Sequence, residues 1–483
     1  MINTSALRRI VIDKAVAGKL VNDTTLNNAE DELKNRLLQH NLPNKNKVDK
    51  EGLWENIPSN WTWTNLDNLT DSDSLNDGDW VLKKDMSEDG EVKLIQLGSI
   101  GNCFFKDKAH KLLTLEHFNE LNGKQIYPGY MLINRLVTDR MNACIIPKIS
   151  GVLMTAVDVC WVKPVDDLYN IEYLMYALSS TGVQNMVSQL GHGVTRFRIS
   201  KTNLIKIPIP FPPLELQGEI VNRIKEVYSI LDKIDYLQSQ YNSDVDVLKN
   251  KIIDAGIQAK LTEQFVDDGS ADDLFKSIQI KKEQLIKEKK IKKEKSLLEI
   301  TEDEIPFVIP QNWKWVRLGE ICSKISSGNT PAGGAKGGAY VDEGYCFFRE
   351  QNIYNDGIHE EGMVYISEEL LDSRPNSTVL PNDILLNITG GSIGRCALVP
   401  EDFTRGSINQ HILIIRTVDP RIRFYVHKCL CSPYYQKLIM GNVVGDKDGF
   451  SAGRCKNTLI PLPPISEQER IVERIDSLLS AIE

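Results

Sequence analysis

The sequence of 483 residues has few of the residues that build metal and disulfide sites. Its nine cysteines are scattered, and only Cys429 and Cys431 lie close together, so that no C-x-x-C pair occurs. The seven histidines form no H-E-x-x-H motif and no grouping typical of a catalytic triad. This usage predicts reduced thiols in a cytoplasmic protein, with no disulfide framework and no metal site.

Long hydrophobic runs are also missing. No run approaches the roughly 18 apolar residues of a transmembrane helix, so no membrane span is expected. Charges at Arg8, Arg9, Asp13 and Lys14 interrupt the first apolar positions, which excludes a signal peptide. The net charge of −9 is weak evidence against nucleic-acid binding, because phosphate contacts need Lys and Arg, but a basic cleft can lie within an acidic protein.

Motifs of DNA-modifying enzymes are absent or incomplete. A methyltransferase would need a glycine loop and an Asn/Asp-Pro-Pro-aromatic motif, and the Pro-Pro pairs that begin at Pro212 and Pro463 do not fit it. Asp79, Glu91 and Lys93 resemble the D…E-x-K arrangement of some nucleases, although a strand that begins after a turn explains them more simply. We therefore expect a protein without catalytic residues.

The glycine-rich stretch Ser327 to Gly338 is the other motif that suggests phosphate. Its backbone amides could approach a phosphate group. It lacks the G-x-x-x-x-G-K-[ST] spacing, so it is not a nucleotide-binding P-loop.

The most prominent feature that is present is a long helix between Pro212 and Leu261. Its apolar residues alternate at spacings of four and three, which is typical of a coiled-coil helix. About 40 residues at ~1.5 Å each give a rod of roughly 60 Å, which needs a partner helix to bury its apolar side. This stripe consists of Ile220, Ile224, Val227, Leu231, Ile234, Tyr241, Val245, Leu248, Ile252, Ala255 and Ala259.

Shorter elements are expected on both sides of this helix. Four prolines within Ile207 to Pro213 argue against regular structure there. A Lys-rich helix from Ala271 to about Leu297 is most simply a solvated helix, with direct nucleic-acid contact as the alternative. The other expected elements are helices at Thr4 to Leu20 and Ile171 to Leu178, and strands at Val92 to Gln96, Tyr130 to Leu136 and Val152 to Val162.

The chain repeats itself, and this is its most informative property. The segment Ile309 to Trp315 matches Ile57 to Trp63 at an offset of 252 residues. Leu380 to Asn387 matches Tyr127 to Asn134 at an offset of 253, and Pro463 to Gln468 matches Pro212 to Gln217 at an offset of 251. Three matches in the same order indicate a tandem duplication. The paired Asn-Trp-x-Trp elements are most simply core residues at the start of each half.

The helices repeat in a circular order. Ile471, Ile475, Leu478 and Ile482 lie 251 residues after the first four stripe positions. The N-terminal segment matches the end of the central helix at an offset of 241 residues, so that Leu7, Val11 and Leu20 correspond to Leu248, Ile252 and Leu261. We therefore expect half a rod, a globular domain, a whole rod, a second domain and half a rod, with the rods packed antiparallel and the stripe buried. The packing and docking residues are Leu7, Val11, Ile220, Ile224, Val227, Leu231, Ile234, Val245, Leu248, Ile252, Ile471, Ile475, Leu478 and Ile482.

These motifs together resemble the specificity subunits of type I restriction–modification systems. The resemblance rests on the stretch Pro461 to Gln468 before a heptad helix, the paired Trp motifs, Gly391 to Gly394, and Lys287 to Lys293. It covers essentially the whole chain, in order. The first copy departs from the pattern in having Leu216 where the second has Glu467, which concerns only a local cap or partner contact.

The resemblance implies two target recognition domains of mixed α/β fold that each read half of a bipartite site in double-stranded DNA. It also implies that the helices set the spacing and dock two methyltransferase subunits, and that motor–nuclease subunits join the full complex. The chain itself would have no catalysis and no cofactor. The expected parts are an N-terminal half-helix and linker (1–51), recognition domains at 52–211 and 305–462, the central helix (212–262), a linker with the Lys-rich helix (263–304) and a C-terminal half-helix (463–483).

Candidate DNA-binding residues are those that can read bases or meet phosphates from loops. In the first domain they are Lys83, Lys84, Gln96, Arg135, Thr138, Arg140, Asn142, Thr195, Arg196 and Arg198. In the second domain they are Asn329, Thr330, Lys336, Arg349, Gln351, Asn352, Asn387, Thr389, Ser392, Arg395, Arg405, Asn409, Gln410 and Lys447. The alternative function is a non-catalytic scaffold whose duplicated domains hold protein partners.

Overall fold

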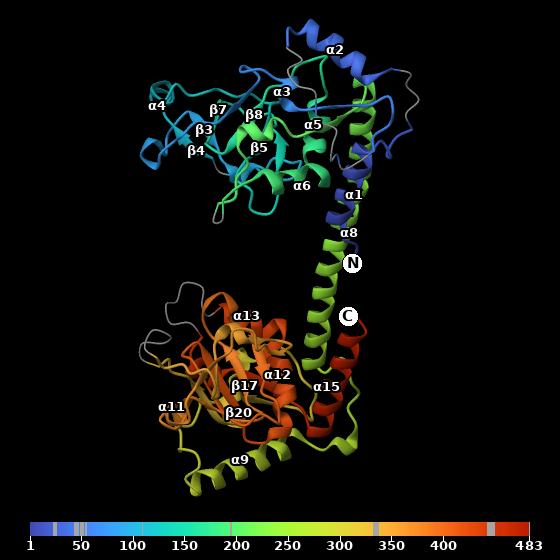
Figure 1. The fold of residues 1–483 in the computed structure, drawn as a ribbon. Coiled ribbons are helices and arrows are strands. Elements are labelled where there is room, and N and C mark those ends of the chain that lie inside the picture. Colours follow the sequence, from blue (N-terminus) through green and yellow to red (C-terminus); the bar gives the residue numbers. More distant parts are fainter. Residues whose placement is uncertain are drawn as a thin grey trace. The chain divides into compact units, whose positions relative to one another are not determined.

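The computed structural model describes the chain except residues 23–26, 43–47, 49–52, 54–55, 109, 194–195, 332–337, 442–449 and 483. It divides into two compact units, Met1–Ser239 and Gln240–Glu483 (Figure 1). Each unit combines small sheets with short helices, in agreement with the expected mixed α/β class. In the part of the chain that the structure describes, no helix has the length and apolar character needed to span a bilayer.

The first unit is built on three small sheets. The largest is antiparallel with the order β2-β8-β5-β6, formed by β2 (Leu75–Asp77), β8 (Val159–Val162), β5 (Met131–Asn134) and β6 (Ala143–Ile145). A sheet in the order β4-β3-β7 contains β4 (Lys111–Leu113), β3 (Val92–Ile95) and β7 (Val152–Thr155). β1 (Thr62–Thr64) pairs with β9 (Ile209–Phe211). The helices are α1 (Thr4–Val16), α2 (Ala29–Gln39), α3 (Leu66–Leu69), α4 (Leu115–Glu120), α5 (Ile171–Leu178), α6 (Thr181–Leu190) and α7 (Lys201–Leu204).

The second unit repeats this plan. One of its two four-stranded sheets has the order β11-β20-β17-β18, with β11 (Cys322–Ser327), β20 (Ile412–Thr417), β17 (Ile384–Asn387) and β18 (Cys396–Leu398). The next has the order β15-β12-β19-β16, with β15 (Val364–Ile366), β12 (Tyr345–Phe348), β19 (Gly406–Ile408) and β16 (Thr378–Val379). Two pairs are β10 (Lys314–Arg317) with β21 (Leu459–Leu462), and β13 (Ile353–Tyr354) with β14 (Gly357–Ile358). The helices are α9 (Ala271–Lys287), α10 (Leu318–Ile321), α11 (Glu368–Asp372), α12 (Arg423–Cys431), α13 (Pro433–Gly441), α14 (Ala452–Asn457) and α15 (Ile465–Ser480).

The two units share the register of their strand pairs as well as their strand order. Leu132 pairs with Trp161 in the first unit, and the residues 253 positions later, Leu385 and Ile414, pair in the second. The parallel pairs β3-β7 and β12-β19 match at the same offset. The tandem duplication is therefore confirmed residue by residue. Because a slip of one residue would exchange the buried and exposed faces of a strand, the shared register preserves both cores.

The proline-rich segments form strands, and the expectation of irregular structure there is wrong. Pro210 pairs with Trp63 and Pro461 pairs with Trp315, each within a two-stranded sheet. A strand with one neighbour tolerates the missing proline N–H when that side carries no ladder hydrogen bond. In both units a tyrosine hydroxyl also donates to the proline carbonyl at 2.8 Å, Tyr173 to Pro210 and Tyr425 to Pro461.

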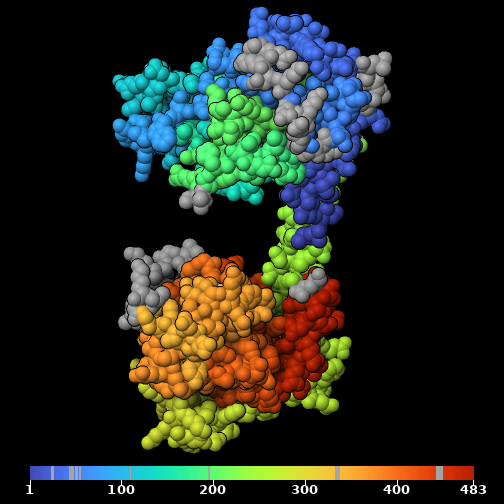
Figure 2. Space-filling view, in the orientation of Figure 1, coloured from blue at the N-terminus to red at the C-terminus, as the bar shows by residue number. Residues whose placement is uncertain are grey.

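The central helix α8 (Leu214–Ile257) has 44 residues and finds a partner helix in each unit. In the first unit α1 lies antiparallel to it, with Arg8 bonded to Asp232 at 2.8 Å and to Asp235 at 2.7 Å. In the second unit α15 lies against its last turns, where a Cβ on Gly256 would come within 2.6 Å of Ile475. Figure 2 shows α15 in red on one flank of the second unit. Antiparallel packing of half-rods is thus observed within each unit.

The apolar stripe of α8 is buried at both ends of the helix but not in its middle. Ile220, Ile224 and Ile252 are buried, whereas Tyr241 is 60% exposed and Leu248 is 44% exposed. The expectation of a stripe buried along its whole length is therefore wrong. The partner helices α1 and α15 are shorter than α8, and large apolar side chains of the middle turns remain exposed.

Three other elements differ from their expected bounds, and a left-handed backbone residue explains each. α1 ends at Val16 because Gly18, at φ 68°, reverses the chain. The expected strand Val152 to Val162 is two strands, β7 and β8, separated by a turn with Asp158 at φ 71°. α9 ends at Lys287 rather than near Leu297, and Lys289 follows at φ 60°.

The paired Trp motifs are core elements, as expected. Trp61 and Trp313 are both 6% exposed and belong to the main hydrophobic cluster of their units. The Leu216 and Glu467 difference is also structural. Leu216 is buried among apolar residues, whereas Glu467 is buried and accepts hydrogen bonds from Trp313 and Gln264, both at 2.8 Å.

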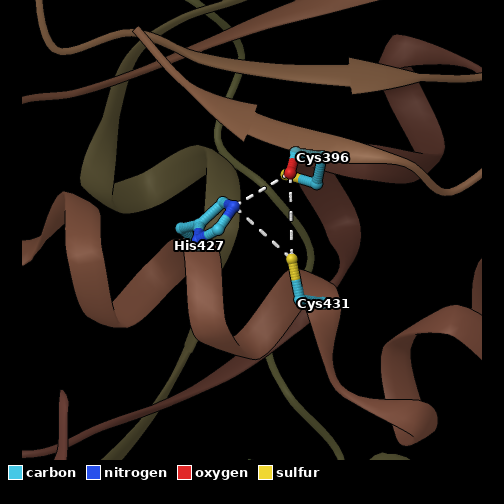
Figure 3. A group of neighbouring side chains, drawn as sticks. All are labelled: Cys396, His427 and Cys431. Atoms are coloured by element: carbon cyan, nitrogen blue, oxygen red, sulfur yellow. Dashed lines mark hydrogen bonds between the residues drawn. The ribbon is translucent and has the colours of Figure 1, made fainter. Parts of the chain in front are cut away.

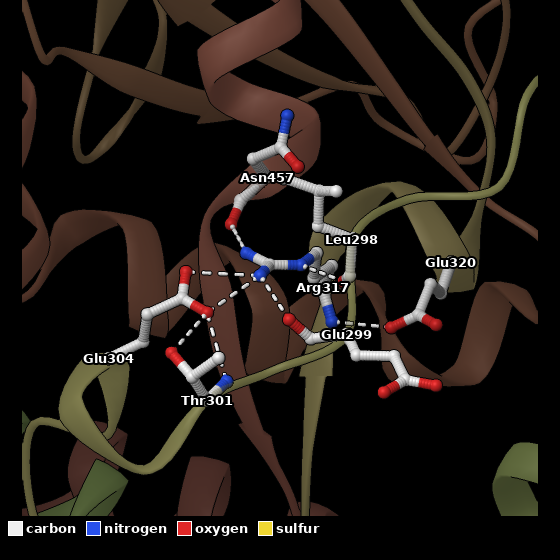
Figure 4. Close-up of polar contacts among 7 residues, drawn as sticks. All are labelled: Leu298, Glu299, Thr301, Glu304, Arg317, Glu320 and Asn457. Atoms are coloured by element: carbon white, nitrogen blue, oxygen red, sulfur yellow. Dashed lines mark hydrogen bonds and ion pairs between the residues drawn. The ribbon is translucent and has the colours of Figure 1, made fainter.

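The linker that precedes the second domain is fastened by Arg317 (Figure 4). This buried guanidinium donates to the carbonyl oxygens of Leu298 at 2.7 Å, Glu299 at 3.1 Å and Asn457 at 2.9 Å. It also contacts both carboxylate oxygens of Glu304, at 3.0 and 2.8 Å. One side chain thus joins the linker, β10 and the end of α14.

Candidate nucleic-acid interface

Equivalent asparagines lie at the same place in both domains, at the end of the inner strands β5 and β17 of the equivalent four-stranded sheets. Asn134 ends β5 and accepts a hydrogen bond from the backbone N–H of Asn142. Asn387 ends β17 and donates to the carbonyl of Glu350 at 2.8 Å and to the hydroxyl of Ser392 at 3.1 Å. Both asparagines are buried, so they hold the loops that follow the strand rather than project from them.

A polar network surrounds this point in the second domain. Asn409 donates to the Glu350 carboxylate at 2.7 Å, and Thr389 bonds to His411 Nδ1 at 2.6 Å. Gln410 bonds to the other ring nitrogen of His411 at 3.1 Å. Burial by itself would raise the pKa of Glu350, but the Asn409 hydrogen bond and the backbone lower it, so the carboxylate is charged and can accept hydrogen bonds. The network is held by side chains from segments far apart in the sequence.

An aromatic stack lies in the same domain. The rings of Tyr354 and His359 stack with centroids 4.0 Å apart and 14° between their planes. The guanidinium of Arg395 lies 4.2 Å from the centroid of the Tyr354 ring. Such contacts fix the orientation of an arginine that is partly exposed, and the planar guanidinium suits bidentate contacts to guanine or phosphate.

In the first domain, carboxylates position several of the predicted arginines. Arg135 bonds to Asp77 and Arg198 bonds to Asp158, both at 2.7 Å. Arg140 donates to the carbonyl of Ser179 at 2.6 Å. These arginines support the loops next to Asn134 and have part of their donor capacity occupied.

The predicted site residues thus fall into four groups. Exposed side chains belong to Lys83, Lys84, Gln96, Thr138, Arg196, Asn329, Thr330, Gln351 and Gln410. Partly buried ones belong to Arg135, Arg140, Asn142, Arg198, Arg349, Thr389, Ser392, Arg395 and Arg405. Asn352, Asn387 and Asn409 are buried and bonded within the domain. Thr195, Lys336 and Lys447 lie outside the described residues.

Sequence reasoning missed several residues of this region, above all Glu350, His411 and Tyr354. Alignment of the two halves at an offset of 253 residues could have indicated His411, because it corresponds to Asp158, which bonds to the predicted Arg198 in the first domain. At the same offset, Leu97 of the first domain corresponds to Glu350 of the second, and Ala156 corresponds to Asn409. The two domains therefore share a backbone frame and carry different side chains around it.

One group with metal-binding chemistry also escaped the sequence analysis. The structure brings Cys396, His427 and Cys431 together in the interior of the second unit, with their potential ligand atoms within 4.8 Å of one another (Figure 3). The sequence spacing did not indicate it, because Cys396 lies on a strand and the other two residues lie on a helix.

Two copies of one α/β domain, each fastened to antiparallel helices and each with its own polar rim, define a protein with two related recognition modules. Comparison with known families agrees with this description. A family profile described as "Type I restriction modification DNA specificity domain" matches residues 58–237 and 310–483. The chain belongs to this family.

Individual relatives extend over nearly the whole chain. The type I restriction enzyme EcoAI specificity subunit of Escherichia coli is 23% identical, with 98% of this chain and 88% of the relative covered. The EcoEI specificity subunit of the same species is 21% identical, with 97% and 88% covered. A solved structure described as "Structural basis underlying complex assembly and conformational transition of the type I R-M system" has a TM-score of 0.56 at 17% identity, covering 89% of this chain and 92% of that one. This likeness shows the shared fold.

Proposed function

We propose that this chain is the DNA-specificity subunit of a type I restriction–modification complex and that each domain reads one half of a bipartite duplex target. The observation that carries the proposal is the shared strand register with different side chains around Asn134 and Asn387. A common frame presents both domains to DNA in the same way. The different side chains around Asn134 and Asn387 then read different base sequences.

The chemistry of the exposed side chains supports DNA readout. Arg and Lys bind guanine edges and phosphates, and Asn and Gln bind adenine. Arg196 and Gln96 in the first domain and Gln351 and Gln410 in the second offer these groups at the surface. The alternative of a protein-binding scaffold does not account for this set as directly.

The middle of α8 suits protein partners. Tyr236, Leu237 and Tyr241 are large apolar side chains on neighbouring turns of α8, and each is at least 60% exposed. We propose that methyltransferase subunits dock there and that motor–nuclease subunits join the resulting complex. The chain itself supplies recognition and spacing, since a helix of 44 residues extends about 66 Å and half-sites one turn apart lie ~34–36 Å from each other.

The first test is methylome sequencing of a host that makes this chain together with a methyltransferase partner, compared with a deletion of this chain alone. A split motif that disappears on deletion supports the proposal and also identifies the target. An unchanged methylome, with both proteins present in the parent strain, contradicts it and favours the scaffold.

Single substitutions then test whether the domains read independently. Arg196→Ala should relax or weaken recognition of one half-site, and Gln410→Ala should affect the other. Each changed base contact should cost about 1–3 kcal/mol of discrimination. Equal losses at both half-sites from either variant would argue against independent readers.

Partner docking has its own test. Tyr241→Glu places a charge on an exposed position and should leave the chain folded. It should weaken assembly with the methyltransferase subunit in size-exclusion chromatography. The matched control is Asp244→Ala, an exposed polar position on the same helix, which should assemble normally.

A further inference from the structure

The group formed by Cys396, His427 and Cys431 comes from two adjoining elements of the second unit. His427 and Cys431 are four residues apart on α12 and therefore face the same way. Cys396 is the first residue of β18, which packs against α12. All three residues are buried, at 7%, 9% and 0% exposure for His427, Cys431 and Cys396.

The distances fit a bound metal ion. Tetrahedral zinc with Zn–S near 2.3 Å and Zn–N near 2.0–2.1 Å requires sulfur-to-nitrogen separations of roughly 3.6 Å and sulfur-to-sulfur separations of about 3.8 Å. The Cys431 sulfur lies 3.5 Å from His427 Nε2, and the three ligand atoms lie within 4.8 Å of one another. Small rotations of the side chains would bring all three to one ion.

The ligand chemistry favours a soft divalent ion. Two cysteine sulfurs and an imidazole nitrogen are the ligand types that zinc and similar divalent ions prefer. The second ring nitrogen of His427, Nδ1, is buried and has no hydrogen-bond partner among the described residues. Nδ1 can therefore carry the ring proton when Nε2 binds an ion.

A cavity of about 620 Å³ adjoins the group. His427 and Cys431 form part of its wall, together with Asn355 and Asp356. Three protein ligands leave one tetrahedral position, and water from this cavity can occupy it.

The first domain has the same backbone without these ligands. The equivalent positions, at offsets of 253 and 252, carry Ala143, Met175 and Ser179. Ser179 there donates to the carbonyl of Met175 at 3.0 Å. The second domain thus carries a set of three metal-binding side chains where its duplicate carries none, in a frame that folds with either set.

We infer that Cys396, His427 and Cys431 form a binding site for one divalent ion of the zinc class, with the fourth position open to the adjoining cavity. Both thiols bind as thiolates and release their protons to solvent. His427 binds through Nε2, which in the ion-free state donates to the carbonyl of Cys396 at 2.9 Å. The ion joins α12 to β18 and thereby stabilises the second domain.

The first domain supplies substitutions that suit this frame. Cys396→Ala, His427→Met and Cys431→Ser each introduce the residue found at the equivalent position. The matched control is Cys346→Ser, a half-buried thiol of the same unit outside the group. Full-length proteins without a metal-binding tag would be loaded with Zn²⁺, passed over a chelating resin and analysed for bound metal by mass spectrometry.

We expect about one zinc ion per chain in the parent and in Cys346→Ser, and a loss of at least tenfold in each of the three variants. Loading with Co²⁺ should give thiolate-to-cobalt charge-transfer absorption in the parent and not in Cys431→Ser. Removal of the metal should lower the melting temperature of the parent but leave the triple variant unchanged.

Three outcomes would overturn the inference. A parent chain that retains no metal after loading would leave only a hydrogen-bonded Cys–His pair. Equal metal content in the parent and the triple variant would place the ion elsewhere. If Cys396 and Cys431 are instead recovered as a disulfide from protein purified under reducing conditions, the metal site is likewise excluded.

Discussion

The indole N–H of Trp313 donates a hydrogen bond to the buried carboxylate of Glu467 at 2.8 Å. The same carboxylate accepts from Gln264 and Thr262 in the segment that follows α8. The first domain has Leu216 at the equivalent position, buried within its main hydrophobic cluster. The equivalent positions therefore carry a hydrogen-bonded acid in the second domain and an apolar side chain in the first.

Glu467→Leu, which introduces the residue of the first domain, should destabilise the second unit. The Trp313 indole and the Gln264 amide lose a buried acceptor, which costs about 1–3 kcal/mol. Urea unfolding followed by tryptophan fluorescence measures the loss. Glu469→Leu, at an exposed position of the same helix, should change stability little. A neutral Glu467→Leu would mean that the polar contacts add nothing beyond packing.

Arg317→Met should release the linker that precedes β10. The carbonyl oxygens of Leu298 and Asn457 would lose their donor, at a cost of about 2–3 kcal/mol. Limited proteolysis should show faster cleavage between residues 288 and 304. Lys314→Met is the control, since its ion pair with Asp272 is exposed and should contribute little. Unchanged cleavage in Arg317→Met would contradict the fastening role.

Lys324 should give the second unit a pH-dependent stability. Burial, followed by the charge of Arg416, lowers the pKa of Lys324 from 10.5 to about 8. Between pH 8 and 10.5 the unfolded chain holds this proton and the folded chain does not, so the contribution of Lys324 to stability rises with pH across that window. Below pH 8 the charged form carries its full penalty.

Lys324→Met removes this contribution. The stability of the variant relative to the parent should therefore be greatest near pH 7.5 and should fall by pH 9.5. Urea midpoints at several pH values test it, and the difference between the two proteins cancels the buried thiols and tyrosines that titrate in both. A difference that stays constant with pH would show that Lys324 keeps its ordinary pKa.

Lys83→Ala combined with Lys84→Ala should weaken DNA binding without changing its sequence preference. Both side chains are exposed, and a lost phosphate contact reduces the salt slope by about 1 for each residue. Salt titration of binding to specific and random duplexes measures it. Lys281→Ala combined with Lys287→Ala on α9 is the comparison and should leave the slope unchanged, because that helix is expected to be solvated. An equal reduction in both double variants would assign the effect to total charge.

The sequence by itself determined the duplication, the long helix and the family resemblance. The Trp61 and Trp313 motifs and the four–three apolar spacing of α8 are local patterns. They can be recognised in the sequence because each depends only on residues that are near one another in the chain. The helix Ile171–Leu178 was likewise predicted with its observed bounds. The proline-rich strands β9 and β21 were missed because their pairing partners lie far away in the sequence.

Only the tertiary structure decided which polar residues hold the fold and which remain at the surface. Asn352, Asn387 and Asn409 look like base-reading amides in the sequence, yet buried carbonyl and carboxylate groups use them. Cys396 joins His427 and Cys431 only because β18 packs against α12. The sequence gives the chemistry of each side chain. The exposure and the partners of that side chain depend on contacts between distant segments, which no local pattern encodes.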